Sequence, residues 1–222
     1  YQFNGYFDEL KKVNIPASVV SIGNTAFKNC SGLKEVNMSN SVTTIGEDAF
    51  KNCLALNRIN ICNSVENIGN NAFEGCAALD NVVIPASVKT IGKNIFKNCT
   101  SLKNITIPSS VTSIGDYAFK NCTSLKKVVI PDSVESIGKN AFEGCSNLTQ
   151  IDIPNSVKTI GAYAFNSCDS LTGISIPTSV RNINSASFGH GSRVNTIRFN
   201  GKVYNSISEF MDAFYEFKFS RR

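Results

Sequence analysis

Cysteine is the residue type whose number and spacing in this sequence most strongly suggest chemistry. Seven of the eight cysteines recur every 23 residues, at Cys30, Cys53, Cys76, Cys99, Cys122, Cys145 and Cys168. A structural metal site needs ligands that converge, commonly as C-x-x-C pairs, and no such pair occurs. Cysteines at one position of stacked repeats point in parallel, which also suits disulfides poorly. We therefore expect buried, unbonded thiols, with Cys62, outside the series, as the most accessible one.

Catalytic groups are scarce. His190 is the only histidine, so a Ser-His-Asp or Cys-His relay would have to include it. It stands in S-F-G-H-G-S-R, which is more typical of a solvated turn than of a general base. Carboxylates such as Glu47, Asp48, Glu135 and Asp152 occupy variable polar positions, where solvation is the expected role. No phosphate-binding loop or dinucleotide fingerprint is present. We expect no enzymatic activity, no metal and no cofactor.

The cysteines belong to a repeat that positions every other residue. Eight gapless units of 23 residues begin at Ile15, Met38, Ile61, Ile84, Ile107, Ile130, Ile153 and Ile176. Counted from the start of each unit, position 5 is always Val, position 8 always Ile and position 13 always Phe, whereas many polar positions vary. This pattern predicts stacked coils, because each coil leaves an apolar face that only its neighbours can cover.

The spacing within a unit predicts its local structure. Val128 and Ile130 are two residues apart and share one face of a short strand, which Pro131 ends because it cannot donate to a ladder. A second extended piece follows at V-x-x-I. Residues 118–122 place Ala, Phe and Cys at the spacing of one helical turn. With strands about 4.8 Å apart, eight coils extend about 40 Å and line one face with a parallel sheet.

Glycine occupies position 9 in seven units, and the eighth unit has Asn184 there. Asn tolerates a left-handed backbone better than most residues, so this position is predicted to need a positive φ. The alternative is that glycine only makes room for packing, which fits Asn184 less well.

The consensus unit I-P-x-S-V-x-x-I-G-x-x-A-F-x-x-C-x-x-L-x-x-V-x resembles the BspA-like class of leucine-rich repeats. The resemblance covers Ile15 to about Arg198. Ser39 and Cys62 depart from the consensus by replacing Pro, and the eighth unit diverges from it further. It implies an α/β-type solenoid, a right-handed leucine-rich-repeat-like superhelix with a parallel sheet on one face and short helical turns on the other. Proteins of this class are typically large, surface-displayed or secreted, and several are implicated in adhesion. The resemblance thus implies an extracellular or cell-surface, adhesin-like recognition module.

The two ends of the chain are expected to act as caps. Residues 1–14 carry a partial repeat, in which Phe3, Tyr6 and Phe7 are candidates to cover the first coil unless a longer array has been cut here. Residues 15–198 hold the eight repeats. Residues 199–222 contain apolar side chains at helical spacing over 206–217, after a capping-box signature of Ser and Glu. We interpret this helix as a lid over the last coil, with a partner-docking helix as the alternative.

Composition narrows the range of partners. The 222 residues are 42% hydrophobic and carry a net charge of +5. The apolar content excludes a disordered chain, and no run of 18 apolar residues predicts membrane insertion. The mild charge gives no indication of a nucleic-acid partner. We expect a protein or glycoprotein partner on a host or neighbouring cell.

The exposed strand positions 20, 21 and 23 are the first candidates for a binding face. They carry Lys34, Glu35, Arg58, Lys103, Lys126, Lys127, Asp152 and Arg198. Large aromatic residues are absent from these positions, although tight interfaces usually bury some. Binding is therefore expected to be weak and charge-based, or to need several copies. Two alternatives stay open: a solvated face on a structural spacer, and anchoring through Tyr117 and Tyr163 on another side.

Overall fold

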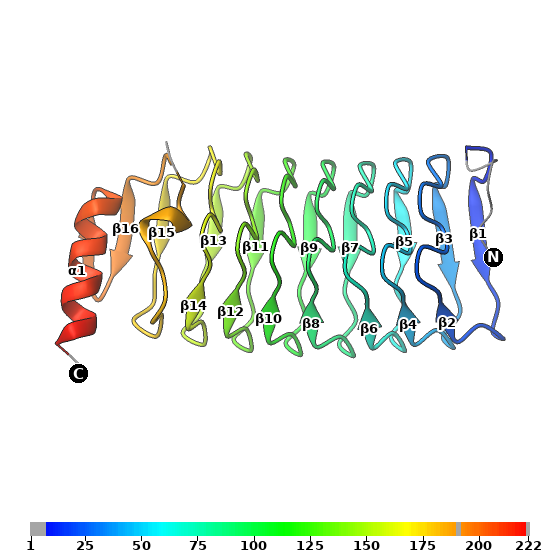
Figure 1. Ribbon diagram of the computed structural model, residues 1–222, viewed down its shortest axis with the longest axis horizontal. Helices are drawn as coiled ribbons and strands as arrows, with labels where there is room; N and C mark the ends of the chain where they lie inside the picture. Colours follow the sequence, from blue (N-terminus) through cyan, green and yellow to red (C-terminus); the bar gives the residue numbers. More distant parts are fainter. Residues whose placement is uncertain (1–7, 190–191, 221–222) are drawn as a thin grey trace.

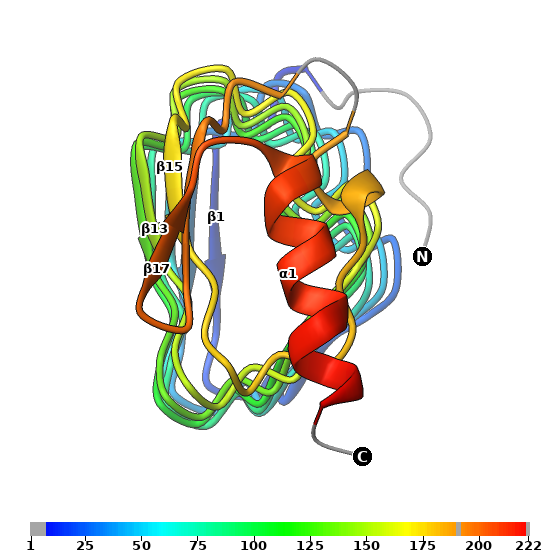
Figure 2. The same cartoon turned by 90° about the vertical axis from the view of Figure 1, so that its left-hand side faces the viewer.

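A computed structural model describes residues 8–189 and 192–220 of the chain. The backbone winds into an elongated row of coils, each about 23 residues long (Figure 1). Seen along the row, the coils superimpose around a common interior, and one helix lies across the C-terminal end (Figure 2). The predicted leucine-rich-repeat-type solenoid is therefore confirmed.

One side of every coil is a short strand at positions 21–23, so that these strands form parallel ladders with a register of 23 residues. The strands are β1 (Lys12–Ile15), β3 (Glu35–Met38), β5 (Arg58–Asn60), β7 (Asn81–Val83), β9 (Asn104–Thr106), β11 (Lys127–Val129), β13 (Gln150–Asp152), β15 (Gly173–Ser175) and β16 (Thr196–Phe199). Val128, for example, pairs with Ile151. Position 22 points into the core while its two neighbours face solvent, as strand alternation requires. β17 (Lys202–Tyr204) closes the row by pairing antiparallel with β16.

A second row of two-residue strands forms at positions 7 and 8, where the sequence predicted an extended piece. These strands are β2 (Ser21–Ile22), β4 (Thr44–Ile45), β6 (Asn67–Ile68), β8 (Thr90–Ile91), β10 (Ser113–Ile114), β12 (Ser136–Ile137) and β14 (Thr159–Ile160). The serine at position 4 fixes the bend between the two rows by donating to the valine carbonyl of the preceding coil. Ser156 Oγ, for example, lies 2.7 Å from the Val134 oxygen.

The third side of each coil is a run of tight turns, and the short helical turn predicted there is wrong. Positions 11 and 15 are left-handed, as at Asn94 (φ 55°) and Asn98 (φ 61°). A left-handed residue every fourth position interrupts a right-handed helix. The alternate N–H groups instead donate to the next coil, as from Phe96 to the Ala118 oxygen at 2.9 Å. In the described residues only the last coil has a helical turn here, the 3-10 helix η1 (Ser185–Ser187).

The prediction of a positive φ at position 9 is also wrong, and the packing alternative is correct. The left-handed glycines of the described chain lie elsewhere, and Asn184 is extended, with a φ of −141°. A Cβ built on Gly138 would lie 2.6 Å from the backbone nitrogen of Asp116 and 2.6 Å from the carbonyl carbon of Gly115. The preceding coil therefore passes too close to Gly138 for any side chain there.

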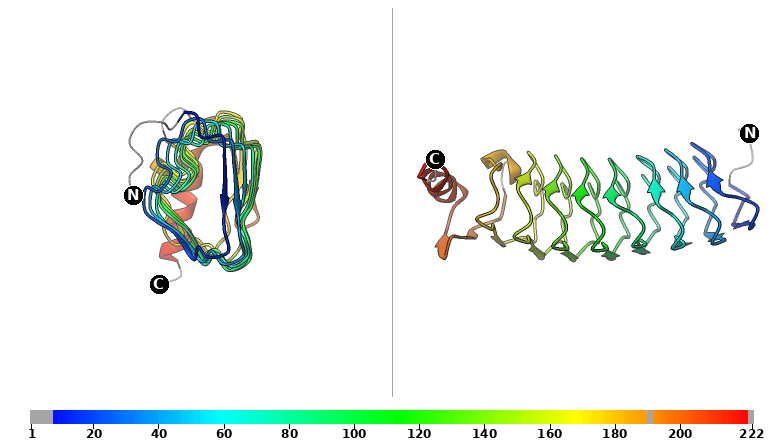
Figure 3. Two further views of the ribbon diagram at one scale, coloured as in Figure 1. Left: turned by 90° about the vertical axis from the view of Figure 1, so that its right-hand side faces the viewer. Right: turned by 90° about the horizontal axis from the view of Figure 1, so that it is seen from below.

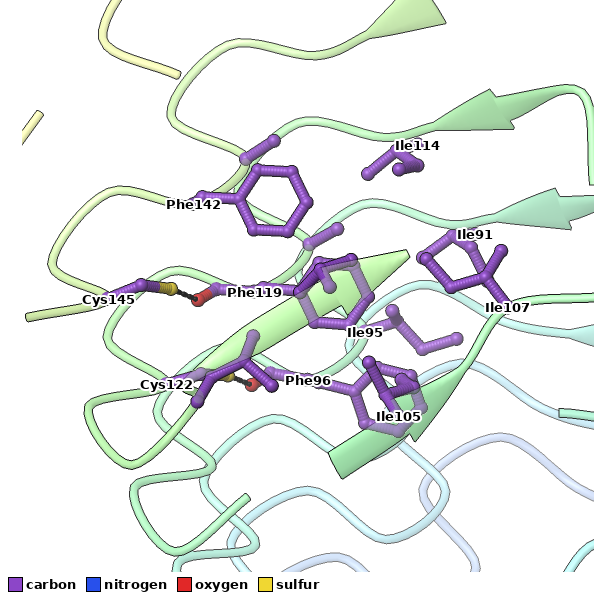
Figure 4. Close-up of a cluster of buried hydrophobic side chains, with 14 of the residues drawn as sticks. Ile91, Ile95, Phe96, Ile105, Ile107, Ile114, Phe119, Cys122, Phe142 and Cys145 are labelled. Atoms are coloured by element: carbon purple, nitrogen blue, oxygen red, sulfur yellow. Dashed lines mark hydrogen bonds between the residues drawn. The ribbon is translucent and has the colours of Figure 1, made fainter. Parts of the chain in front are cut away.

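The core is a continuous column of apolar side chains along the solenoid axis. The phenylalanine rings at position 13 stack from Phe27 to Phe165, with centroids 5.2–6.0 Å apart and ring planes within 11° of parallel. Figure 4 shows Phe96, Phe119 and Phe142 in this stack beside the isoleucines of the strands. Each coil thus completes the core of its neighbours, as the repeat predicted.

The helix expected over residues 206–217 is α1 (Ile207–Phe219). Ser206 caps it, because its Oγ accepts the Glu209 N–H at 3.2 Å. Phe210 and Phe214 are buried against Phe199, with ring centroids 5.6 and 5.7 Å away. The apolar face is therefore covered by the chain's own last coil, which supports the lid and not the docking helix. The expected N-terminal cap residues Phe3, Tyr6 and Phe7 lie outside the described residues.

The stack contains one seam. Only here in the described chain is pairing lost in both rows: β5 does not pair with β7, nor β6 with β8, and the spacing is wider there (Figure 3). β9 does not pair with β11 either, but the second row is unbroken at that point, from β8 to β14. The Gly92 N–H has no hydrogen-bond partner among the described residues, whereas the equivalent Gly115 N–H donates to Ile91 at 2.7 Å. The turn side stays bonded across the seam, since the Phe73 N–H donates to Ile95 at 3.0 Å. The two coils are thus joined at their turns and parted at their strands.

Candidate interaction surface

The cysteines are packed inside the coils, where most of them donate hydrogen bonds to the preceding coil. All eight are free and buried, which confirms the interior role predicted for the repeated series. Six of these thiols donate to the phenylalanine carbonyl of the preceding coil, as from Cys122 Sγ to the Phe96 oxygen at 3.1 Å (Figure 4). Cys62 has the largest exposed fraction, 5%, but it is buried too and bonds to the Ser39 oxygen at 3.2 Å. Cys62 is therefore the most exposed of the eight thiols, as predicted, but it is still buried.

Burial also sets the acidity of these thiols. It raises the pKa of Cys53 and of Cys168 to about 12 and that of Cys122 well above its ordinary value, because a thiolate would lose its hydration inside the coil. Thiolates are the nucleophilic and metal-binding form of cysteine. The series therefore cannot act as a reactive or metal-binding site while the coils are stacked.

We expect the native thiols to be inert to an aromatic disulfide reagent near neutral pH and all eight to react in denaturant. The pKa of the buried thiols in the folded chain lies above their value of about 8.5 in the unfolded chain, so the folded state holds the thiol protons more tightly. The contribution of the buried thiols to the free energy of unfolding is therefore fully present below about pH 8.5 and is lost as the pH rises toward 12. Absorbance of the released thiolate and denaturation midpoints at about pH 7 and about pH 10 check this. Rapid native labelling, or a midpoint unchanged at high pH, would contradict it.

The strand-lined side carries all eight of the predicted partner-binding residues. They are exposed except for Glu35, which is half-buried. A hydrogen bond from Lys12 Nζ at 3.0 Å lowers the pKa of Glu35 and holds it as an anion. The eight residues do not converge, because seven coils separate Glu35 from Arg198, about 34 Å at the usual strand spacing. They therefore form several local groups and not one site.

One of these groups stands out, and we call it the central patch: Lys103, Lys126 and Lys127 together with Val83 and Val129. The three lysines form no ion pair within the described part of the chain. Val83 is 68% and Val129 60% exposed, at position 23 of β7 and β11. The sequence analysis missed both valines, although a β-branched apolar residue among Asn, Thr and Asp at position 23 was the available signal.

The N-terminal group of the predicted partner-binding residues, which includes Glu35 and Arg58, lies at the seam between β5 and β7. A shallow hollow of about 530 Å³ opens between β3, β5 and β7 and is lined by polar side chains that include Glu35, Arg58 and Asp80. Its position follows from the missing pairing between β5 and β7. The strand-lined side is thus mixed in character, with a polar hollow near its N-terminal end and the cationic, partly apolar central patch beside it.

Charged residues on the turn side are paired with one another. Lys51 bridges to Glu74 at 2.9 Å, and Lys97 bridges to the same carboxylate at 3.1 Å. Asp48 is not the solvated carboxylate that was expected. Burial acts to raise the pKa of Asp48, but the hydrogen bond from Lys28 at 2.7 Å and further contacts outweigh this effect, so the pKa is lowered. These groups stabilise neighbouring turns and leave no unpaired acid or base for catalysis among them.

The other candidates offer less. Tyr117 and Tyr163 are half-buried, and Lys120 Nζ lies 5.6 Å from the centre of the Tyr117 ring. His190 lies outside the described residues. Within residues 8–189 and 192–220, no three His, Cys, Asp or Glu side chains are grouped so that they could hold a metal ion. No helix in the same ranges is long and apolar enough to cross a bilayer.

Comparison with known proteins gives one family. The family model described as "BspA type leucine rich repeat region" matches residues 1–126 and 112–220, in six copies. A leucine-rich repeat protein of T. pallidum is 32% identical, with a TM-score of 0.68 over 73% of this chain and 78% of that one. One from Bacteroides ovatus is 28% identical, with a TM-score of 0.63 over 85% of this chain and 63% of that one. One from Eubacterium ventriosum is 25% identical, with a TM-score of 0.58 over 89% and 62%. The search of curated proteins found no match.

Proposed function

Because the chain belongs to the BspA-type leucine-rich repeat family, we propose that it is a non-catalytic recognition module displayed at the cell surface or secreted. Its strand-lined side binds an acidic surface of a protein or glycoprotein on a host or neighbouring cell, in the manner of an adhesin. The chain spans less than two thirds of the length of two of its structural relatives, 63% and 62%. The proposed partner therefore concerns this repeat region and not a whole protein.

The central patch is the observation that carries this proposal. Three lysines that form no ion pair with any described residue attract an acidic partner. Val83 and Val129 lie beside them and lose unfavourable contact with water when a partner covers them. Exposed side chains at positions 21 and 23 are also free of the packing constraints that fix position 22.

Affinity through this face is expected to be modest for a single copy. The patch is shallow and contains no large aromatic anchor, whereas strong interface residues are usually Trp, Tyr or Arg in desolvated pockets. Several copies displayed together raise the effective concentration of the sites and increase avidity without new contacts.

The test is binding of the labelled chain to epithelial cells and to immobilised matrix proteins. The variant replaces Lys103, Lys126 and Lys127 by serine, and the matched control replaces Lys89, Lys93 and Lys139, which are equally exposed but lie on other sides of the coil. We expect the patch variant to lose at least about tenfold in apparent affinity, the effect of about 1.4 kcal/mol. The control should bind like the unmodified chain.

Equal binding by the two variants would overturn the recognition function. A chain that binds none of these targets would favour the second candidate, a structural spacer. The continuous core favours the spacer in one respect, because it makes an elongated rod able to hold another domain away from a surface (Figure 1).

A further inference from the structure

A cavity of about 860 Å³ lies at the C-terminal end of the solenoid, away from the strand-lined side. It is a half-open hollow between the last turns of α1 and the loops that precede β14 and its equivalent in the last coil. Figure 1 shows these elements at the C-terminal end of the row. The lining residues are Asn155, Lys158, Thr178, Ser179, Val180, Arg181, Phe214, Phe217 and Lys218. Its volume is in the range of small-molecule sites.

The cavity is positively charged. Lys158, Arg181 and Lys218 line it, and no carboxylate side chain of the described residues does. Lys158 bridges to Glu135 at 2.9 Å, but both side chains are more than half exposed, so this pair is weak and easily exchanged. Arg181 and Lys218 form no ion pair with any residue that the structure describes. Two cations without an ion pair among the described residues thus line the same half-open space.

The opposite wall is aromatic. Phe214 is buried and Phe217 half-buried, and both are held by Phe199, with ring centroids at 5.7 and 5.2 Å. Packing against the last coil fixes both rings. Phe214 is only 1% exposed, so Phe217 supplies the accessible apolar surface at the edge of the cavity. Asn155 and Thr178 are exposed at the rim and supply neutral hydrogen-bonding groups.

These three features define one ligand chemistry: a negative group, a ring with an apolar face, and hydroxyls. We propose that this cavity binds an acidic saccharide, sulfated or carboxylated. Arg181 and Lys218 hold the acid group through charge-assisted hydrogen bonds, Phe217 contacts the C–H face of the sugar ring, and Asn155 and Thr178 bond to its hydroxyls. The site does not depend on the central patch, because the two share no residue.

The probe is a sulfated heparin disaccharide, titrated into the full chain by calorimetry. The test variant is Arg181→Ser, and the matched control is Lys89→Ser, an equally exposed cation at the same position 6, four coils away. We expect the disaccharide to bind the unmodified chain and Lys89→Ser alike. Arg181→Ser should weaken binding by about tenfold or more, as loss of one charge-assisted hydrogen bond does.

Further arms separate the site from general charge attraction. Inorganic sulfate and the desulfated disaccharide should each bind at least about tenfold more weakly than the sulfated one. The central-patch variant should keep its disaccharide affinity, which distinguishes failure of this site from failure of the proposed function. Absence of binding, equal weakening by Arg181→Ser and Lys89→Ser, or inorganic sulfate binding as tightly as the disaccharide would each overturn the proposal.

Discussion

Replacing Phe119 by alanine is expected to lower the free energy of unfolding by about 3–5 kcal/mol. The side chain is completely buried and stacks on Phe96 at 5.7 Å and on Phe142 at 5.3 Å. The substitution removes the transfer free energy of the ring and leaves a cavity between two coils that cannot close without bending the rod. Because each coil is stabilised mainly by its neighbours, the substitution destabilises the coils on both sides of Phe119.

Phe27→Ala is the matched control. Phe27 occupies the same position 13 in the first unit, but it is half-buried and stacks on Phe50 at 5.2 Å. We expect a clearly smaller loss there. Equilibrium unfolding in guanidinium, followed by circular dichroism, measures both variants, and Phe119→Ala is expected to broaden or split the transition because it separates the array into two halves. Equal losses at the two positions would show that the coils do not depend on their neighbours in this way.

Replacing Gly138 by alanine is the second large expected effect, a loss of about 1–3 kcal/mol or more through overpacking. The new Cβ would lie 2.6 Å from two backbone atoms of the preceding coil. Backbone cannot move aside as a flexible side chain can, so the coils must separate locally and weaken the ladder from the Gly138 N–H to Ile114, now 2.8 Å long.

Gly23→Ala is a control substitution that is expected to stabilise the protein, whereas Gly138→Ala destabilises it. Gly23 stands at the same position 9 in the first unit, but nothing lies within 4 Å of its added Cβ. Its φ is not left-handed, so alanine fits and reduces the entropy of the unfolded chain, which stabilises the protein by about 0.4–1 kcal/mol. Thermal unfolding of the two variants should shift in opposite directions. Destabilisation by both would mean that position 9 needs a glycine backbone and not only space.

The two effects explain how one chain combines a uniform scaffold with a variable surface. Positions 9 and 13 are fixed by contact with the neighbouring coil, as Gly138 and Phe119 show. Positions 20, 21 and 23 touch little but solvent, so their side chains vary without cost to the stack. The proposed central patch therefore lies where change is tolerated, and its variants should fold normally.

Much of the fold was determined by the sequence alone. The 23-residue period placed Phe119 and Cys122 in the interior and Val128 on the buried face of a strand. These predictions hold because each depends on the pattern within one unit, which repeats eight times and is averaged over many independent substitutions. The capped helix after Ser206 lies outside the repeats and followed from its own apolar spacing and capping box. The exposed sides of the strands, and with them all eight candidate partner-binding residues, followed from the same alternation.

What only the tertiary structure decided depends on the distance and angle between coils. The left-handed residues at Asn94 and Asn98, the close approach at Gly138, the pairing of Asp48 with Lys28 and the seam at Gly92 are all relations between units. So are the grouping of Val83 with Lys127 and the cavity beneath α1. A periodic sequence specifies that coils stack, but contacts between side chains of different coils depend on how closely and at what rotation they stack, and that is set by the sum of all contacts at once.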